Sequence, residues 1–257
     1  MTATQIETQP RTEGAGYDDL PALISLMSGD EKHSAAAHST LDVVWVLYDR
    51  ILDVTPETAG DPNRDRFYLS KGHGPMAYYA TLAAKGFIPD EWLPGWLEFD
   101  SPLGSHPDRN LVPGVEISSG SLGHGLPLAV GTALGLRAQG LSTSGAGARV
   151  VVLVGDAELD EGSNHEALEL AAALGLDNLT VVVVDNRSSS YAVGGRVADR
   201  FRTEGWHTVT VDGRDHGQLE TALSYRPAGR PNAVVATVIE PVIEPVIEPV
   251  IATVESK

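Results

Sequence analysis

The chain has 257 residues and is acidic, with 18 Lys and Arg against 35 Asp and Glu and a formal net charge of −17 at pH 7. This charge argues against nucleic acid or an anionic membrane as the main partner, because both bind basic protein surfaces. The absence of cysteine excludes disulfides, thiolate metal sites and a cysteine nucleophile. We recognise no signal peptide and no apolar run of membrane-spanning length, and therefore expect a cytoplasmic protein.

The N-terminal half predicts a flexible arm followed by helices. Residues 1–16 are polar and unpatterned, which is typical of an arm without fixed structure. Apolar residues recur at helical spacing over 18–27 and 39–52, and an alanine-rich helix is expected over 76–85. A short strand, FYLS at 67–70, precedes this last helix.

The C-terminal half predicts a parallel sheet. Two continuous apolar strands, ARVVVLVGD and LTVVVVDN, flank the helical segment EALELAAALGLDN, and further helices and strands alternate up to NAVVATV. Strands that are apolar on both faces and joined by helices indicate a parallel sheet covered on both sides. We therefore predict an α/β fold with an open, doubly wound, mostly parallel sheet over residues 17–237.

The C-terminal tail, 238–257, contains the repeat VIEPVIEPVIEP from Val238 to Pro249. Proline at every fourth position excludes an interior strand or helix, so the tail is expected to be extended. It either lies along another subunit or hangs free.

Polar residues follow the two apolar strands of the predicted sheet. Asp156 ends the first, and Asn186 ends the next, thirty residues later. Carboxyl ends of parallel strands meet at one edge, where ligands of such sheets bind. Carboxylate and amide oxygens suit a hard cation such as Mg²⁺ or Ca²⁺, and the backbone N–H groups after Gly155 suit a phosphate. These residues predict a site for a metal-bridged diphosphate.

The segment from Gly155 to Asn186, which begins GDAELDEGSNHEA, resembles the thiamine diphosphate motif, and in particular that of transketolase. Three more segments resemble transketolase motifs in the same order: SKGHG at Ser70–Gly74, GSHPD at Gly104–Asp108, and GVEISSGSLGHG at Gly114–Gly125. The resemblance covers roughly residues 18–237 and implies the N-terminal, diphosphate-binding subunit of a split, two-component transketolase.

The resemblance implies a role for each matching residue. Asp156, Asn186 and the backbone carbonyl of Ser188 would bind the metal. His73, Gly155 and the Ala157 amide would contact the diphosphate, while Gly120 and Leu122 would contact the thiamine rings. His33, His73 and His106 are the candidate catalytic residues, with His33 and His106 facing the sugar. Of the remaining carboxylates in the turn, Glu161 is expected near the subunit interface, and Glu158 and Asp160 at the surface.

The resemblance also implies a reaction and a partner. Transketolases transfer a two-carbon ketol unit from a ketose to an aldehyde acceptor, so sugars or sugar phosphates are the expected substrates. The glutamate that activates thiamine diphosphate belongs to a pyrimidine-binding domain that this sequence lacks. A C-terminal transketolase-like subunit would supply it, and an α2β2 heterotetramer is the expected assembly.

The sequence departs from the transketolase pattern at three places. Ala157 replaces the second glycine of GDG, His124 replaces a glutamine, and no histidine follows His216, where the family has one that contacts the diphosphate. Two alternatives follow. The chain is a subunit of another thiamine diphosphate enzyme, an oxo-acid dehydrogenase or decarboxylase, or it is a non-catalytic scaffold that retains the fold.

Overall fold

The computed structural model describes residues 14–28, 31–72, 74–189 and 195–238, with the backbone alone over 31–36. Most of the predicted N-terminal arm and nearly all of the VIEP tail therefore lie outside the described residues. His73 does so too, as does the side chain of His33.

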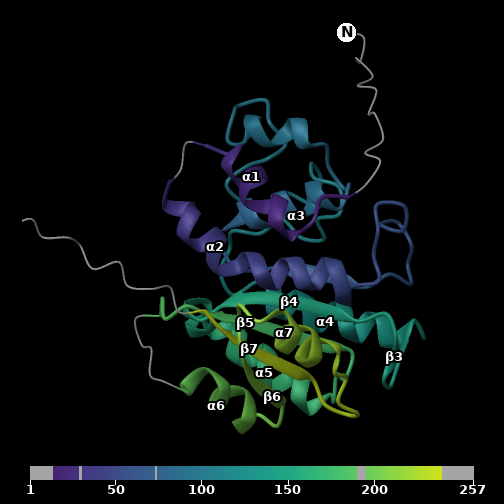
Figure 1. The fold of residues 1–257 in the computed structure, drawn as a ribbon. Coiled ribbons are helices and arrows are strands. Elements are labelled where there is room, and N and C mark those ends of the chain that lie inside the picture. Colours follow the sequence, from purple (N-terminus) through teal and green to yellow (C-terminus); the bar gives the residue numbers. More distant parts are fainter. Residues whose placement is uncertain (1–13, 29–30, 73, 190–194, 239–257) are drawn as a thin grey trace, which may run out of the picture.

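Within the described residues, five parallel strands form one sheet at the centre of the molecule (Figure 1). Their order is β1-β4-β5-β7-β6, so the last described strand lies between β5 and β6. In the β4–β5 pair Gly155 is opposite Val184, which brings the residues that follow both strands to the same edge. The strands are β1 (Arg66–Leu69), β4 (Val150–Gly155), β5 (Leu179–Asp185), β6 (His207–Asp212) and β7 (Asn232–Thr237).

Helices cover both faces of this sheet, which confirms the predicted doubly wound architecture. Alternate residues of the central strands face opposite ways, so Leu153 and Val182 belong to one hydrophobic cluster and Val152 and Val181 to the other. The first cluster includes α1, α2, α3 and α7, and the second includes α4, α5 and α6; Figure 1 shows α1–α3 above the sheet and α5 and α6 below it. The helices are α1 (Leu20–Ser25), α2 (Glu31–Val46), α3 (Pro75–Ala84), α4 (Gly125–Ala138), α5 (Gly162–Ala173), α6 (Arg196–Thr203) and α7 (His216–Ser224).

The shorter elements are less evident from the sequence. The helix expected over 39–52 begins at Glu31 and ends in a π-helical turn, Leu47–Ile51. The hairpin of β2 (Ser142–Thr143) and β3 (Ala146–Gly147) was not predicted, because two-residue strands show no periodicity. Single 3-10 turns form at Tyr17–Asp19, Asp90–Gly95 and Ala157–Asp160.

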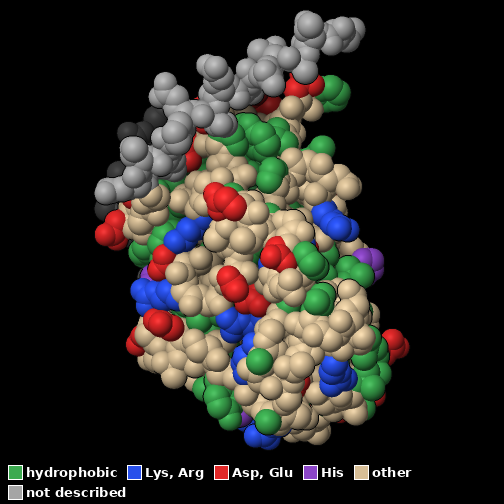
Figure 2. Space-filling model, turned by 90° about the vertical axis from the view of Figure 1, so that its right-hand side faces the viewer, with side chains coloured by type: hydrophobic (Ala, Val, Ile, Leu, Met, Phe, Trp, Pro, Cys, Tyr) green, Lys and Arg blue, Asp and Glu red, His purple; other side chains and the backbone are tan. Residues whose placement is uncertain are grey.

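The described surface carries mixed charges. Figure 2 shows acidic and basic side chains interspersed over one face of the molecule. Among the described residues no helix combines the length and the apolar character needed to cross a membrane.

Candidate functional site

Asp156 is the first residue after β4, at the carboxyl edge of the sheet. Its side chain is only 2% exposed, because the wholly buried strand VVVLVG delivers it to the interior. One carboxylate oxygen accepts a hydrogen bond from Ser188 Oγ at 2.5 Å, and the other accepts one from the Ser189 backbone N–H at 3.0 Å. The turn after β5 thus closes over Asp156, because the pairing of β4 with β5 brings the ends of both strands to the same edge.

Asn186, the first residue after β5, presents a buried oxygen at this edge. Its Oδ1 accepts no hydrogen bond from any described residue. The next residue, Arg187, has a left-handed backbone (φ 60°), which turns the chain so that Ser188 reaches Asp156. A buried acceptor without a donor is unfavourable unless another group satisfies it. A bound cation would do so.

The oxygen donors at this edge fit a hard cation whose remaining ligands come from a diphosphate. It comprises one carboxylate (Asp156) and one amide oxygen (Asn186), the oxygen types that Mg²⁺ and Ca²⁺ bind. No group of three His, Asp or Glu in the described chain could hold a metal by itself. In a site of this kind, the phosphate oxygens of a bound diphosphate would supply further ligands. Ser188 meets Asp156 through its hydroxyl, and the ligand role of its carbonyl stays a prediction.

Glu158 lies inside the molecule, so the prediction that it is a surface residue was wrong. It is 2% exposed and accepts hydrogen bonds from Ser70 Oγ, from the Gly123 N–H at 2.9 Å and from the Gly155 N–H at 3.3 Å. Burial raises the pKa of the Glu158 carboxyl, and the three hydrogen bonds oppose this rise without cancelling it. Within a run of four carboxylates, the sequence gives no signal of which one turns inward.

Asp160 is partly exposed, as expected for a residue near the surface, and it is paired. It accepts hydrogen bonds from Arg200 Nη2 at 2.7 Å and from Ser189 Oγ at 2.9 Å. Arg200 also donates to the Leu159 carbonyl at 2.9 Å, so it ties α6 to the turn that follows Asp156.

His106 and Gly120, predicted from two separate motifs, are in contact. Gly120 has a left-handed backbone (φ 108°), and a Cβ on it would come within 2.6 Å of His106 Cδ2. The His106 Nδ1 is buried and has no partner among the described residues. One ring nitrogen of a candidate catalytic histidine is therefore without an internal hydrogen bond.

Leu122 of the GSLGHG segment packs against Gly72 of the SKGHG loop. Its side chain is 43% exposed, and a Cβ on Gly72 would come within 2.9 Å of Leu122 Cδ2. A half-exposed leucine in a loop can cover an apolar ligand. His124, which directly precedes helix α4, is exposed, and its Nε2 lies 3.4 Å from Ser121 Oγ, so a buried structural role does not apply to it.

Lys71 of the same loop was not singled out from the sequence. It is 7% exposed, and its Nζ donates to Thr40 Oγ1 at 3.0 Å. Its methylene stem passes over Gly155, where a Cβ would lie 3.5 Å from Lys71 Cγ. A buried cation thus lies close to the glycine that is predicted to contact the diphosphate.

Ala157, which departs from the family pattern, begins the 3-10 turn after Asp156. Its φ is not positive; the non-glycine residues with positive φ in the described chain are Leu97 and Arg187. A methyl group is therefore compatible with the backbone at this position.

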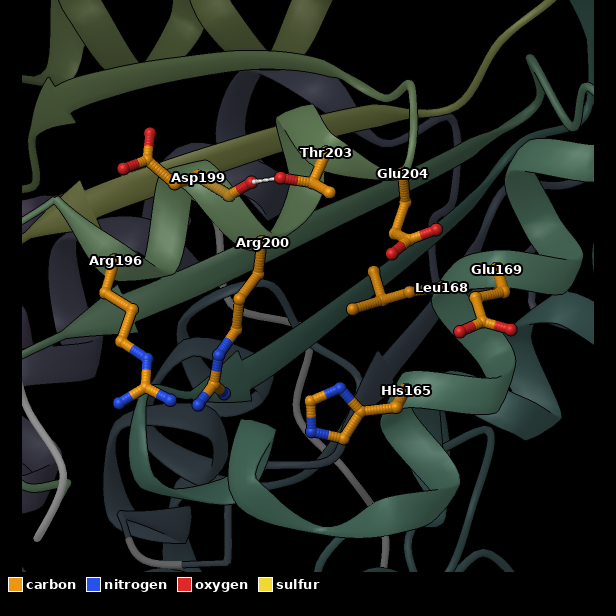
Figure 3. A pocket seen from close by; sticks show the side chains of 8 residues that line it. All are labelled: His165, Leu168, Glu169, Arg196, Asp199, Arg200, Thr203 and Glu204. Atoms are coloured by element: carbon orange, nitrogen blue, oxygen red, sulfur yellow. Dashed lines mark hydrogen bonds between the residues drawn. The ribbon is translucent and has the colours of Figure 1, made fainter.

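Two cavities involve helix α6. One of about 400 Å³ lies at the strand ends and is lined by residues that include Asp156, Asp185 and Arg187. The other, of about 290 Å³, lies between α5 and α6 (Figure 3). Figure 3 shows that Arg196 and Arg200 extend from α6 toward His165 of α5. The residues that line this second cavity include no predicted site residue. Of these two cavities, the first includes a predicted site residue, Asp156, in its lining.

The fold and these motifs match a known family. The profile described as "Transketolase, thiamine diphosphate binding domain" matches residues 22–242. The chain belongs to this transketolase family. Its structure superposes on that of a transketolase from Leishmania mexicana with a TM-score of 0.71 and 26% identity, covering 88% of this chain and 37% of that one.

Two relatives of the transketolase family match over a larger share of their length. One is a subunit of the apulose-4-phosphate transketolase of Actinobacillus succinogenes, 37% identical over 214 residues, which are 79% of this chain and 75% of that protein. A protein of Rhodococcoides fascians named ferredoxin fas2 is 56% identical over 221 residues, which are 86% of this chain and 71% of that protein. The chain thus spans about a third of the full-length transketolase and most of each of these two shorter proteins.

Proposed function

We propose that the chain is the diphosphate-binding subunit of a two-component, magnesium-dependent transketolase that transfers a two-carbon ketol unit between sugars or sugar phosphates. The observation that carries this proposal is the buried Asp156 at the carboxyl edge of β4, held by the turn that carries Asn186 and Ser188. Membership of the family and the name of the Actinobacillus succinogenes relative support it.

Each predicted residue has a task in this proposal. Asp156 and Asn186 would hold Mg²⁺, or Ca²⁺, and Ser188 would complete the protein ligands. Gly155, Ala157 and His73 would face the diphosphate, and Gly120 and Leu122 would face the rings. When bound, thiamine diphosphate would supply the carbon nucleophile that adds to the ketose carbonyl.

The histidines would hold and move protons on the sugar. An imidazole titrates near neutral pH and can act as donor or acceptor to a hydroxyl. His106 suits this task because its Nδ1 has no hydrogen-bond partner among the described residues, and Gly120 fixes the position of the ring. His33 and His73 would act beside it.

The partner in this proposal is a C-terminal subunit that carries the pyrimidine-binding domain and the activating glutamate. Two copies of each subunit would form an α2β2 heterotetramer in the cytoplasm. The Actinobacillus succinogenes relative is named as one subunit of its transketolase, which supports the presence of a second polypeptide here.

The name of the Rhodococcoides fascians relative suggests a different class, electron transfer. The present 257 residues contain no cysteine, whereas iron–sulfur clusters are held by cysteine thiolates. The match to this relative covers 86% of the chain, so it includes most of residues 22–242, which the transketolase profile matches. Thiamine-dependent transfer is therefore the function we assign to it.

Calorimetry on the chain mixed with its pyrimidine-binding partner tests the proposal. Titration with thiamine diphosphate and Mg²⁺ should release heat of binding, and the loaded complex should transfer two carbons from a ketose to an aldehyde. No uptake in the presence of the partner would favour the scaffold alternative. Uptake without two-carbon transfer would favour the other thiamine diphosphate enzymes.

A matched pair of variants isolates the metal site. Asp156→Ala should abolish uptake. Asp177→Ala is the control, because Asp177 is also buried and also accepts one serine hydroxyl (Ser144, 2.7 Å) and one backbone N–H (Gly229, 3.2 Å), but it precedes β5 at the opposite edge. If both variants bind the cofactor like the wild type, the metal assignment is wrong.

A further inference from the structure

Glu158 joins three loops that sequence motifs assign to the cofactor. Its Oε1 accepts from Ser70 Oγ of the SKGHG loop and from the Gly123 N–H of the GSLGHG loop, and its Oε2 accepts from the Gly155 N–H at the end of β4. These donors come from three segments far apart in the chain, and each lies within three residues of a predicted cofactor contact.

Ser70 extends this network by one more bond. Its hydroxyl donates to Glu158 and accepts a hydrogen bond from the Gly125 N–H at 3.0 Å. The carboxylate therefore fixes two points of the GSLGHG loop, Gly123 directly and Gly125 through Ser70. Gly120 and Leu122, the predicted ring contacts, lie in the same loop.

The loops approach one another more closely than side chains allow. A Cβ on Gly125 would lie 2.2 Å from the Cβ of Ser70, and a Cβ on Gly123 would lie 2.6 Å from Ser163 Oγ. Backbone N–H groups buried at such contacts need an acceptor, since water has no access to them. The long side chain of Glu158 reaches between the loops and supplies that acceptor.

We propose that Glu158 is a positioning residue that holds the SKGHG loop, the GSLGHG loop and the end of β4 in the arrangement that binds the cofactor. The inference rests on the proposed function. Glu158 is not among the residues predicted to contact the cofactor, and it acts through Ser70, Gly123 and Gly155. Its position two residues after Asp156 couples this clamp to the metal turn.

Amide hydrogen exchange on the full chain without cofactor tests the clamp directly. In Glu158→Ala the N–H groups of Gly123 and Gly155 should exchange at least about tenfold faster than in the wild type, because each loses its acceptor. Glu158→Gln is the conservative variant. Its amide oxygen can still accept from Ser70 and Gly123, so the Gly155 N–H alone should exchange faster.

Calorimetry with thiamine diphosphate and Mg²⁺, with the partner subunit present, tests the consequence. Glu158→Ala should weaken binding roughly 10- to 100-fold, as loss of a supporting residue does at other metal sites, with Glu158→Gln between it and the wild type. Ser70→Ala is a milder variant that removes the link to Gly125. It should also weaken cofactor binding, and it replaces Glu158→Ala in this test if that variant folds poorly.

Asp65→Ala is the matched control. Asp65 is 6% exposed and accepts from two backbone N–H groups, Asp53 and Arg149, and one side chain, but it precedes β1 at the far edge of the sheet. It should lower the melting temperature and leave the cofactor dissociation constant and the Gly123 and Gly155 exchange rates unchanged.

Three results separate the outcomes. If Glu158→Ala leaves both exchange rates and the dissociation constant at wild-type values, the proposal is overturned. If Asp65→Ala weakens cofactor binding as much as Glu158→Ala does, the effect is general destabilisation and the proposal is again overturned. If the wild type itself takes up no cofactor, the proposed function fails, whereas uptake that Glu158→Ala does not alter refutes the positioning role alone.

Discussion

The His106 ring lies against the backbone of Gly120, with His106 Cδ2 2.6 Å from the point that a Gly120 Cβ would occupy. The glycine is required twice over, by this contact and by its φ of 108°. The HPD loop and the GSLGHG loop are thus joined at the residue that we propose to face the sugar.

Gly120→Ala should therefore displace His106. We expect a fall in the two-carbon transfer rate larger than the accompanying loss of stability, which is about 1–2 kcal/mol for an alanine in a left-handed conformation. Steady-state kinetics and urea unfolding measure the two effects. Gly140→Ala is the control, because Gly140 also has a positive φ (72°) but a Cβ added there would meet no neighbouring atom within 4 Å. Equal losses of transfer rate in both variants would contradict the role assigned to the His106 contact.

Asn186→Ala should separate binding from stability. The Oδ1 of Asn186 is buried and accepts no hydrogen bond from the described part of the chain. Its removal should therefore leave the cofactor-free chain as stable as the wild type or up to about 1 kcal/mol more stable. The stabilisation that cofactor and Mg²⁺ give the wild type, about 2.7 kcal/mol at a hundredfold excess over Kd, should be lost. Thermal unfolding with and without cofactor, in the presence of the partner, measures both.

Asn178→Ala is the control for that experiment. Asn178 also has a buried Oδ1 for which no described residue is a donor, but its Nδ2 donates to the Ala133 carbonyl at 2.9 Å and it lies before β5. This variant should destabilise the cofactor-free chain and keep the gain on cofactor binding. If Asn186→Ala behaves in the same way, Asn186 is not a metal ligand.

The sheet was predictable because its two central strands, β4 and β5, are apolar on both faces. Val151–Val154 and Val181–Val184 are buried throughout, and residues between two helical layers must be apolar at every position. The position of β7 between β5 and β6 was not predictable, since strand order depends on which crossovers pack best and leaves no local pattern.

The site was predictable where a motif or a strand end marked it. Asp156 and Asn186 stand where two parallel strands end, and spacing alone indicated that they share an edge. Glu158 and Lys71 were missed because inward or outward orientation in a loop is set by contacts with distant segments. Ser70 and Gly123 fix Glu158, while Thr40 and Ser39 accept from Lys71.

Ala157→Gly restores the glycine that the family pattern predicts, and we expect no gain from it. Ala157 begins a 3-10 turn with a φ that alanine adopts freely. Glycine there should cost about 0.5–1 kcal/mol through its larger backbone entropy in the unfolded chain. Calorimetry should give a cofactor Kd within about twofold of the wild type, because the backbone at this position has no positive φ that would require glycine. A tenfold tighter Kd would show instead that the methyl group obstructs the diphosphate.

The ion pair between Asp160 and Arg200 should make stability depend on acid pH. The hydrogen bond from Arg200 lowers the pKa of the Asp160 carboxyl, against a smaller opposing effect of burial. A lowered folded-state pKa stabilises the protein above the unfolded value, about 3.9, and this contribution is lost as pH falls through the folded pKa. Arg200→Gln should cost about 1 kcal/mol at pH 7.

The difference between wild type and Arg200→Gln should therefore begin to shrink as pH falls below about 4, and it should be smallest below the lowered folded-state pKa of Asp160. Part of it should remain, because the bond from Arg200 to the Leu159 carbonyl does not titrate. Urea unfolding between pH 3 and 7 measures this. Arg202→Gln is the control, since the Arg202–Asp199 pair is mostly exposed, with side chains 52% and 69% accessible, and should give a curve parallel to the wild type. A pH-independent difference for Arg200→Gln would assign its effect to the carbonyl bond alone.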